Sequence, residues 1–293
     1  MDLRPFGDTG LKASVLGFGG GHLGSSRLDD EGARRLVDTA LDLGVTFLDT
    51  ARGYGDSEER LGRYLRGRRD QVVLSTKVGY DVEGERDWTA AAVTKGVDRA
   101  LRTLQTDVLD VVFLHSCSLD VLKDGAVVEA LLECREAGKV RVPAYSGENE
   151  ELAWAAQSGA FGALQTSVNL VDQWSARKVL PEAADRGLGI VAKRPVANVA
   201  WRHESRPEGV YGELYWERFQ SLGLQPGTDD WVGTAIRFAA FTPGVTTAIV
   251  GTSKPANLAA AVEAIERGPL SEDERLRWEE AFTPHLEEWP GDV

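Results

Sequence analysis

The chain has 293 residues, of which 42% are hydrophobic and 27% charged, and its 33 Lys+Arg against 46 Asp+Glu give a formal net charge of −13. Such an acidic chain lacks the basic surface that a nucleic-acid backbone requires, so we expect no nucleic-acid partner. No apolar stretch approaches the roughly 18 residues that span a bilayer, and the first residues form no apolar signal core. We therefore expect a cytoplasmic protein without a membrane partner.

Cysteines and histidines argue against two further kinds of site. The two cysteines, Cys117 and Cys134, allow at most one disulfide and indicate reduced thiols in a chain of this length. The four histidines have neither HxH nor HxxxH spacing. We therefore assign no metal site and expect no metal-dependent hydrolysis.

From the N-terminus, two short segments at residues 3–6 and 11–13, around a turn at 7–10, predict a β-hairpin. Eight short β-branched or apolar segments predict strands at residues 14–18, 46–49, 72–76, 109–114, 140–145, 163–167, 189–193 and 247–250. Longer segments with helical periodicity predict helices at residues 30–43, 57–65, 89–104, 124–137, 175–186, 231–241 and 255–265. The stretch 197–226, rich in aromatic and charged residues, is interpreted as a long strand-to-helix loop containing a short helix.

The alternation of strands and helices indicates the fold class. Parallel strands joined by right-handed helical crossovers form α/β folds, and eight such strands close into a barrel. A doubly wound open sheet is the alternative, but the first unit lacks a GxGxxG turn followed by an acidic residue. We therefore predict an α/β fold, a (β/α)8 TIM barrel formed by residues 1–293 as a single domain, with the N-terminal β-hairpin covering its bottom.

Four polar side chains lie at or near the ends of three consecutive predicted strands. Asp49, Lys77 and His115 each end an apolar strand, and Tyr54 follows in the loop after Asp49. Active sites of TIM barrels are built at these strand ends. A buried lysine needs a partner, which Asp49 supplies, and a nearby ammonium favours the phenolate and so makes a tyrosine a usable proton donor.

Each of these residues also has a structural interpretation. An aspartate at a strand end can cap a loop, and a lysine can be a rim cation. A loop tyrosine can be a surface aromatic, and a histidine can be a satisfied core residue. The joint placement on three consecutive strand ends and their connecting loop favours an active site.

The same segments resemble the aldo-keto reductase superfamily. Residues 47–58, FLDTARGYGDSE, are similar to its aspartate-to-tyrosine segment, 75–77, STK, to its lysine strand, and 113–115, FLH, to its histidine strand. Residues 4–10, RPFGDTG, and 249–254, IVGTSK, resemble its opening hairpin and its last cofactor loop. The resemblance covers essentially the whole chain.

The resemblance implies an NAD(P)(H)-dependent oxidoreductase. Tyr54 would protonate a carbonyl oxygen as hydride arrives from C4 of a reduced nicotinamide, and would act as the base in the reverse direction. Lys77 would favour the phenolate, Asp49 would hold Lys77, and His115 would orient the carbonyl. The substrate would be a small-molecule carbonyl or sugar.

Cofactor contacts are implied in the same way. Ser146 and Gln165 look like the residues that bind the nicotinamide carboxamide, although Gly147 stands where the family often has asparagine. Lys193 and Arg194 replace an aromatic residue and a serine. Three arrangements are open: Lys193 covers the nicotinamide ring, Arg194 turns toward the pyrophosphate, or both are solvated rim charges. The remaining cofactor-binding candidates are Gly19, Gly20, Gly251, Thr252, Ser253, Lys254 and Asn257.

The last loop bears on which cofactor is used. Free N–H groups at the start of a helix suit a phosphate, and a proline at residue 255 marks such a start. Many relatives hold the adenosine 2′-phosphate with a lysine at the position of Gly251 and an arginine at that of Asn257, and both are absent here. Lys254 or Ser253 would compensate, and we expect NADPH in preference to NADH.

Substrate and biological role stay open between alternatives. Trp88, Trp201, Trp216 and Trp231 lie in or near loops at the expected mouth, where they would line an apolar or sugar-stacking pocket or pack the loops. The leading interpretation is an enzyme that reduces an aldehyde or ketone, or runs the reverse reaction. The alternatives are a sugar 1-dehydrogenase acting oxidatively and a cofactor-sensing binding protein similar to potassium-channel beta subunits. Oligomeric state is left unassigned.

Overall fold

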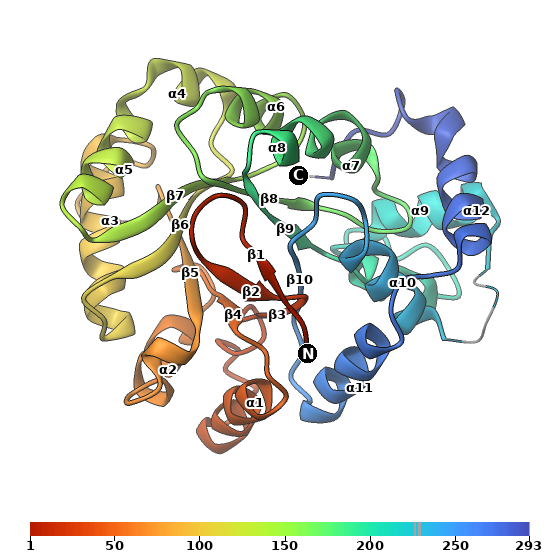
Figure 1. Ribbon diagram of the computed structural model, residues 1–293, viewed down its shortest axis with the longest axis horizontal. Helices are drawn as coiled ribbons and strands as arrows, with labels where there is room; N and C mark the ends of the chain where they lie inside the picture. Colours follow the sequence, from red (N-terminus) through yellow and green to blue (C-terminus); the bar gives the residue numbers. More distant parts are fainter. Residues whose placement is uncertain (226, 228–229, 293) are drawn as a thin grey trace.

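The computed structural model describes residues 1–225, 227 and 230–292, and within them eight parallel strands form a closed barrel (Figure 1). Around the barrel the strand order is β10-β3-β4-β5-β6-β7-β8-β9. The barrel strands are β3 Leu16–Gly19, β4 Phe47–Asp49, β5 Val73–Val78, β6 Leu109–His115, β7 Val140–Ser146, β8 Ala163–Ser167, β9 Gly189–Lys193 and β10 Thr247–Val250. The predicted (β/α)8 barrel is therefore confirmed.

The first predicted strand, 14–18, is wrong at its start. Ser14 ends β2 (Lys12–Ser14), which pairs antiparallel with β1 (Leu3–Pro5) in the N-terminal hairpin. The barrel strand β3 begins at Leu16. Every residue from Ala13 to Gly20 is buried, so the pattern of apolar residues gives no sign of the change of partner.

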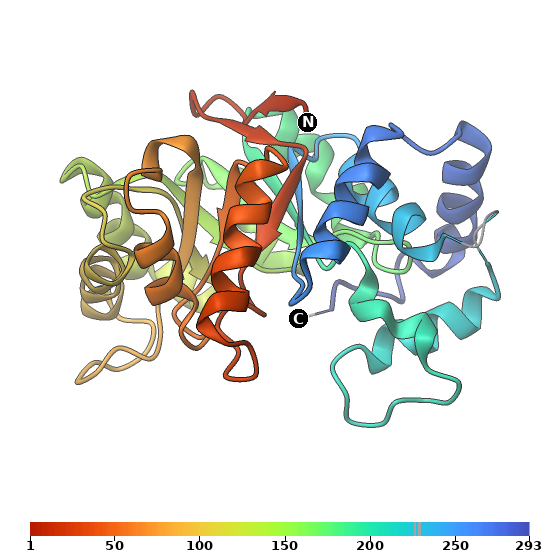
Figure 2. The ribbon, with the colours of Figure 1, turned by 90° about the horizontal axis from the view of Figure 1, so that it is seen from below.

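The hairpin covers the end of the barrel at which the strands begin (Figure 2). Phe6, which follows β1, is fully buried, and its ring centroid lies 5.5 Å from that of Phe47 at the start of β4. An ideal Cβ at Gly189, the first residue of β9, would lie 2.6 Å from the Phe6 ring, so only glycine fits there. The hairpin thus closes the floor of the barrel with an apolar side chain.

Helices surround the barrel (Figure 1). The α-helices in the described residues are α1 Asp30–Asp42, α2 Ser57–Tyr64, α3 Ala90–Leu104, α4 Leu119–Asp124, α5 Ala126–Glu136, α6 Asn149–Gln157, α7 Trp174–Lys178, α8 Leu180–Asp185, α9 Glu213–Leu222, α10 Trp231–Ala240, α11 Pro255–Glu266 and α12 Glu272–Phe282. Short 3-10 helices lie at Arg69–Gln71, Ala197–Arg202 and Thr283–His285. Within these described ranges, no helix has both the length and the apolar character needed to cross a membrane.

Two predicted helices differ from the observed ones. The predicted helix 175–186 is two helices, because Pro181 lies at the start of α8 and has no N–H to continue α7. The predicted helix 124–137 begins at Ala126, because Gly125 has φ +87° and separates α4 from α5. Helices α4, α6 and α12 are additional to the predicted set.

The long loop after β9 contains the predicted short helix, α9. Pro226, the last residue of the predicted loop, lies outside the described residues. Phe219 of α9 packs in an apolar cluster with Trp201 and Trp231, whose rings stack with centroids 5.1 Å apart. Trp201 and Trp231 therefore make the packing contacts that were one of the two roles predicted for them.

Candidate active site

A buried ion pair lies at the ends of β4 and β5. Lys77 Nζ is 2.6 Å from Asp49 Oδ2 and also donates to the carbonyl oxygen of Thr50 at 2.9 Å. Both charged side chains are almost fully buried, with 3% of Lys77 and 1% of Asp49 exposed. Burial, the largest single effect, lowers the pKa of Lys77, but the charges and hydrogen bonds of Asp49 and Tyr54 together outweigh it. The net pKa of Lys77 lies above its ordinary value, so the lysine stays cationic.

Asp49 is held by further donors on neighbouring strands. Ser75 Oγ donates to Asp49 Oδ1 at 2.8 Å, and Gln165 Nε2 donates to the same oxygen at 3.0 Å. A buried carboxylate with one cation and two neutral donors has its lone pairs well satisfied. The position of the lysine charge is therefore fixed from three strands, β4, β5 and β8.

Tyr54 and His115 lie next to this ion pair. Lys77 Nζ is 4.8 Å from the centroid of the Tyr54 ring, and the Tyr54 ring meets the His115 ring edge-on at 6.4 Å. The Tyr54 backbone carbonyl passes so close to Gly24 that an ideal Cβ there would lie 1.4 Å from its oxygen. The structure thus brings together all four residues that the sequence analysis selects at the strand ends.

His115 is a neutral imidazole in this setting. Burial, together with the charges of Lys77 and Lys193, lowers its pKa from an ordinary 6.5 to about 3. Its Nδ1 lies 2.9 Å from the hydroxyl oxygen of Tyr80, in the loop that follows β5. Sequence analysis misses Tyr80; the available signal is a second aromatic hydroxyl three residues beyond Lys77, in a strand-end loop.

Ser146 and Gln165 are adjacent at the ends of β7 and β8. Ser146 Oγ donates to Gln165 Oε1 at 3.1 Å, and Gln165 in turn donates to Asp49. Both side chains are buried, with 1% of each residue exposed. They therefore form a hydrogen-bonded chain from the end of β7 to the ion pair.

Lys193 and Arg194 have specific partners, so the interpretation as solvated rim charges is wrong. Lys193 Nζ lies 3.1 Å from Oε1 of the buried Glu148. Arg194 has φ +54°, its Nη1 lies 3.5 Å from Asp292 Oδ2, and its guanidinium lies 4.8 Å from the centroid of the Tyr211 ring. Both cations already face carboxylates within this chain.

The loop after β10 approaches β3 closely. An ideal Cβ at Gly19 would lie 3.3 Å from the backbone nitrogen of Gly251, and one at Gly20 would lie 2.7 Å from Ser57 Oγ. In the same loop, Thr252 Oγ1 accepts hydrogen bonds from the Lys254 N–H at 3.1 Å and from Asn257 Nδ2 at 3.2 Å. The remaining candidates Gly251, Ser253, Lys254 and Asn257 are exposed.

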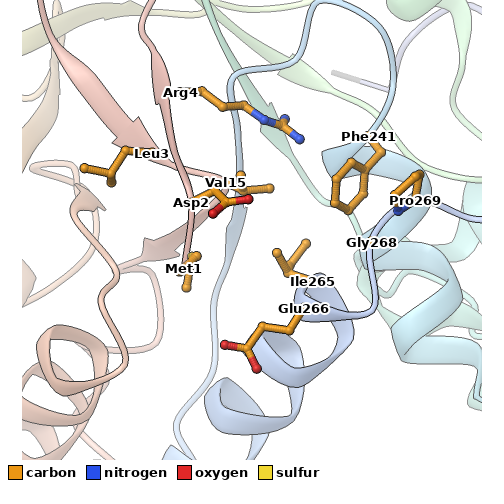
Figure 3. Close-up of a pocket in the computed structure, with 10 residues that line it drawn as sticks. All are labelled: Met1, Asp2, Leu3, Arg4, Val15, Phe241, Ile265, Glu266, Gly268 and Pro269. Atoms are coloured by element: carbon orange, nitrogen blue, oxygen red, sulfur yellow. The ribbon is translucent and has the colours of Figure 1, made fainter.

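A cavity of about 750 Å³ lies beside the hairpin, between it and α10 and α11 (Figure 3). Its lining residues are Met1, Asp2, Leu3, Arg4, Val15, Phe241, Ile265, Glu266, Gly268 and Pro269. Arg4 Nη1 donates to the carbonyl oxygens of Ala240 at 2.7 Å and Val245 at 2.9 Å, so its guanidinium holds the hairpin to the barrel. None of the lining residues belongs to the cluster of Asp49, Tyr54, Lys77 and His115, so the cavity is separate from that cluster.

Comparisons with known proteins agree with this architecture. A model of the aldo/keto reductase family matches residues 15–282. The aldo-keto reductase YhdN of Bacillus subtilis (strain 168) is 31% identical over 63% of this chain. The match covers 59% of the length of YhdN. L-galactose dehydrogenase of Arabidopsis thaliana is 28% identical over 71% of this chain and 69% of its own. The holo form of aldo-keto reductase AKR11C1 from Bacillus halodurans has a TM-score of 0.83 at 29% identity and covers 96% of each chain.

The ends of the barrel strands thus bring together an ion pair, a tyrosine and a neutral histidine, which are groups able to exchange protons or donate hydrogen bonds. The extent of the family match then assigns the chain. It belongs to the aldo/keto reductase family, a family of oxidoreductases.

Proposed function

We propose that this protein is an NAD(P)(H)-dependent oxidoreductase that interconverts a small-molecule aldehyde or ketone and the corresponding alcohol. The observation that carries the proposal is the buried Lys77–Asp49 ion pair, because its ammonium lies 4.8 Å from the centroid of the Tyr54 ring. A fixed positive charge beside a phenol favours release of the phenol proton. Tyr54 is therefore our candidate general acid and base.

Each residue has one task in the proposed reduction. A reduced nicotinamide, when bound, supplies hydride to the carbonyl carbon. Tyr54 Oη gives its proton to the carbonyl oxygen, and Lys77 stabilises the phenolate that remains. Asp49 keeps Lys77 charged, while the neutral His115 donates a hydrogen bond to the carbonyl oxygen. The reverse reaction uses the same groups, with Tyr54 as the base.

Free donors near the strand ends fit a nucleotide cofactor. Among the described residues, no side chain caps the start of α11 at Lys254, but Pro255 has no N–H and the Asn257 N–H donates to the Lys254 carbonyl at 3.0 Å. Ser253 and Lys254 are exposed at this helix start, and their side chains are the donors that we propose for a phosphate. We assign the adenosine phosphate to this loop and the nicotinamide carboxamide to Ser146 and Gln165. NADPH is the proposed cofactor, with Lys254 as the cation for the 2′-phosphate.

The test is turnover of a panel of aldehydes, ketones and aldoses with NADPH, monitored by the decrease in NADPH absorbance. The same panel is measured in parallel with NADH. We expect steady turnover of at least one small carbonyl, and in Tyr54→Phe a loss of about a hundredfold to ten-thousandfold in kcat with unchanged NADPH binding. The matched control is Tyr64→Phe, because the Tyr64 hydroxyl bonds the Asp30 carbonyl on α1, away from the strand ends. A Tyr54→Phe variant that turns over like the control would refute the assignment.

A sugar 1-dehydrogenase is the second candidate, and the similarity to L-galactose dehydrogenase favours it. The same four residues would serve this reaction with Tyr54 as the base. Oxidation of aldoses with NADP⁺ and NAD⁺, compared with reduction of simple aldehydes, separates the two candidates by kcat/KM. Oxidation of bound cofactor in a single slow turnover, with no steady rate, would favour a cofactor-sensing protein instead.

A further inference from the structure

The loop after β5 holds a second tyrosine against the proposed site. The Tyr80 hydroxyl oxygen lies 2.9 Å from His115 Nδ1, and the two rings lie 5.3 Å apart between centroids with a 33° tilt. The Trp88 ring contacts Tyr80 as well, at 5.9 Å between centroids. Tyr80 is therefore held by two aromatic contacts with its hydroxyl at the imidazole.

The backbone of this loop is shaped to bring Trp88 onto Tyr80. Gly79 has φ +126°, and Asp81 and Trp88, which are not glycines, have φ +56° and +59°. The Trp88 N–H donates to the Gly79 carbonyl at 2.7 Å and closes the loop. An ideal Cβ at Gly79 would lie 2.1 Å from the Trp88 ring. Left-handed conformations at non-glycine residues persist where surrounding contacts determine them. Here these are the ring contact of Trp88 with Tyr80 and the hydrogen bond from the Asp81 N–H to Asp87 Oδ1 at 2.9 Å.

The hydroxyl of Tyr80 is also confined from the side of the Tyr54 loop. An ideal Cβ at Gly53 would lie 3.0 Å from this hydroxyl oxygen, so glycine leaves it room. Burial raises the pKa of Tyr80 above its ordinary value, and the neighbouring Tyr54 raises it further. Tyr80 therefore keeps its O–H proton at neutral pH and is able to donate it.

The hydrogen bond at Nδ1 decides what the other nitrogen of His115 can do. A neutral imidazole carries one N–H, and its tautomer follows from the partner of each nitrogen. Among the described residues, Tyr80 is the hydrogen-bond partner of His115, and Nε2 has none. If Tyr80 donates to Nδ1, the proton lies on Nε2. A carbonyl oxygen only accepts hydrogen bonds, so only this tautomer can bind it through Nε2.

We propose that Tyr80 is a positioning residue that holds His115 in the Nε2-protonated tautomer, so that the imidazole donates to the carbonyl oxygen of the substrate. The proposal rests on the proposed function, in which His115 orients that oxygen. Tyr80 acts through His115 and transfers no proton to the substrate. Tyr80, in the loop after β5, is thus a partner of His115 that is not one of the four residues predicted from the strand ends.

The tautomer is measured directly in the full-length protein by long-range proton–nitrogen NMR with labelled histidine. The chain has only four histidines, and a His115→Asn variant identifies the His115 signals. We expect the Nε2-protonated pattern in the wild type. In Tyr80→Phe, which keeps the ring packing, we expect the Nδ1-protonated pattern or an exchanging mixture. Because this measurement needs no turnover, it is independent of whether the proposed activity is correct.

The kinetic arm uses para-nitrobenzaldehyde and NADPH as probes. Tyr80→Phe should lower kcat/KM about tenfold, the value of one neutral hydrogen bond, with NADPH binding unchanged. Gly53→Ala keeps the hydroxyl but displaces it, so it should shift the tautomer and kcat/KM in the same direction. Tyr64→Phe is the control for loss of a tyrosine hydroxyl elsewhere.

The two arms together distinguish a failure of the proposal from a failure of the proposed function. An unchanged His115 tautomer in Tyr80→Phe overturns the proposal, whatever the rate. A changed tautomer with kcat/KM within twofold of the wild type also overturns it. If the wild-type protein turns over none of the carbonyls in the panel, the proposed function fails, and with it the catalytic meaning of the tautomer.

Discussion

Replacing Lys77 by methionine isolates the electrostatic part of the proposed mechanism. Methionine keeps an unbranched side chain and removes the ammonium. That charge lies 4.8 Å from the centroid of the Tyr54 ring. With the phenolate charge placed at the ring centroid and an effective dielectric constant of about 20, the attraction is about 3.5 kcal/mol. The same free energy, lost from the transition state, lowers kcat about 300-fold.

The same variant leaves Asp49 without its cation, so stability must be measured beside activity. Asp49 would keep only its hydrogen bonds from Ser75 and Gln165. Breaking a buried ion pair from one side costs about 3–5 kcal/mol in the free energy of unfolding. The double variant Asp49→Asn/Lys77→Met removes the unpaired charge, so we expect it to recover part of the stability and none of the activity.

The assay combines urea unfolding, NADPH binding by tryptophan fluorescence, and kcat over a range of pH. Lys77→Met should fold, bind NADPH with a Kd close to that of the wild type, and keep its lowered kcat for carbonyl reduction at every pH tested, because the reduction needs a proton from Tyr54. A folded Lys77→Met variant with kcat within about tenfold of the wild type would contradict the reasoning. The charge of Lys77 would then not be what activates Tyr54.

Two further variants test the cofactor loop and the histidine. Asn257→Arg adds an exposed cation on α11 beside Thr252, and we expect it to tighten NADPH binding about tenfold relative to NADH; an unchanged ratio of the two Kd values would place the 2′-phosphate elsewhere. The pKa of His115 falls from 6.5 to about 3 in the folded chain, so between these pH values the unfolded chain binds more protons than the folded one. The contribution of His115 to stability is therefore complete above pH 6.5 and decreases as the pH falls. Between pH 7 and pH 5 this loss is about 2 kcal/mol in the free energy of unfolding measured with urea. In His115→Gln the free energy of unfolding should fall by about 2 kcal/mol less over the same pH range. Equal losses in the wild type and in His115→Gln would show that His115 does not titrate as described.

The strand ends are the part of the site that sequence predicts well. Asp49 and His115 are the last residues of buried, mostly apolar strands, and Lys77 is the second-last residue of β5, which is a buried position where an unpaired lysine is costly. The barrel topology then places the three ends side by side. Both signals, the polar residues near the strand ends and the order of the strands, are visible along the chain. The sequence alone therefore predicts that these three residues lie together.

The contacts of the long loops are not predictable in this way. Tyr80 reaches His115 because Asp81 and Trp88 adopt left-handed backbone conformations, which no hydrophobic period records. Lys193, at the end of β9, forms an ion pair with Glu148, which lies in the segment after β7. These contacts depend on the geometry of loops that are brought together only by the closed barrel.

Gly147 illustrates how a departure from the family pattern is fixed by its neighbours. An ideal Cβ there would lie 2.5 Å from the hydroxyl oxygen of Tyr145, and that hydroxyl donates to the Cys117 carbonyl at 2.9 Å. An asparagine at this position would therefore require Tyr145 to move. Recognition of a carboxamide would fall to Ser146 and Gln165, which are hydrogen-bonded to each other.

That pair is not independent of the proposed acid. Gln165 also donates to Asp49, the carboxylate that holds Lys77 beside Tyr54. A group that binds at Ser146 and Gln165 would compete for, or reinforce, a hydrogen bond that fixes the catalytic charge. The place where a nicotinamide would be held is thus connected, through one buried amide, to the charge proposed to activate the tyrosine.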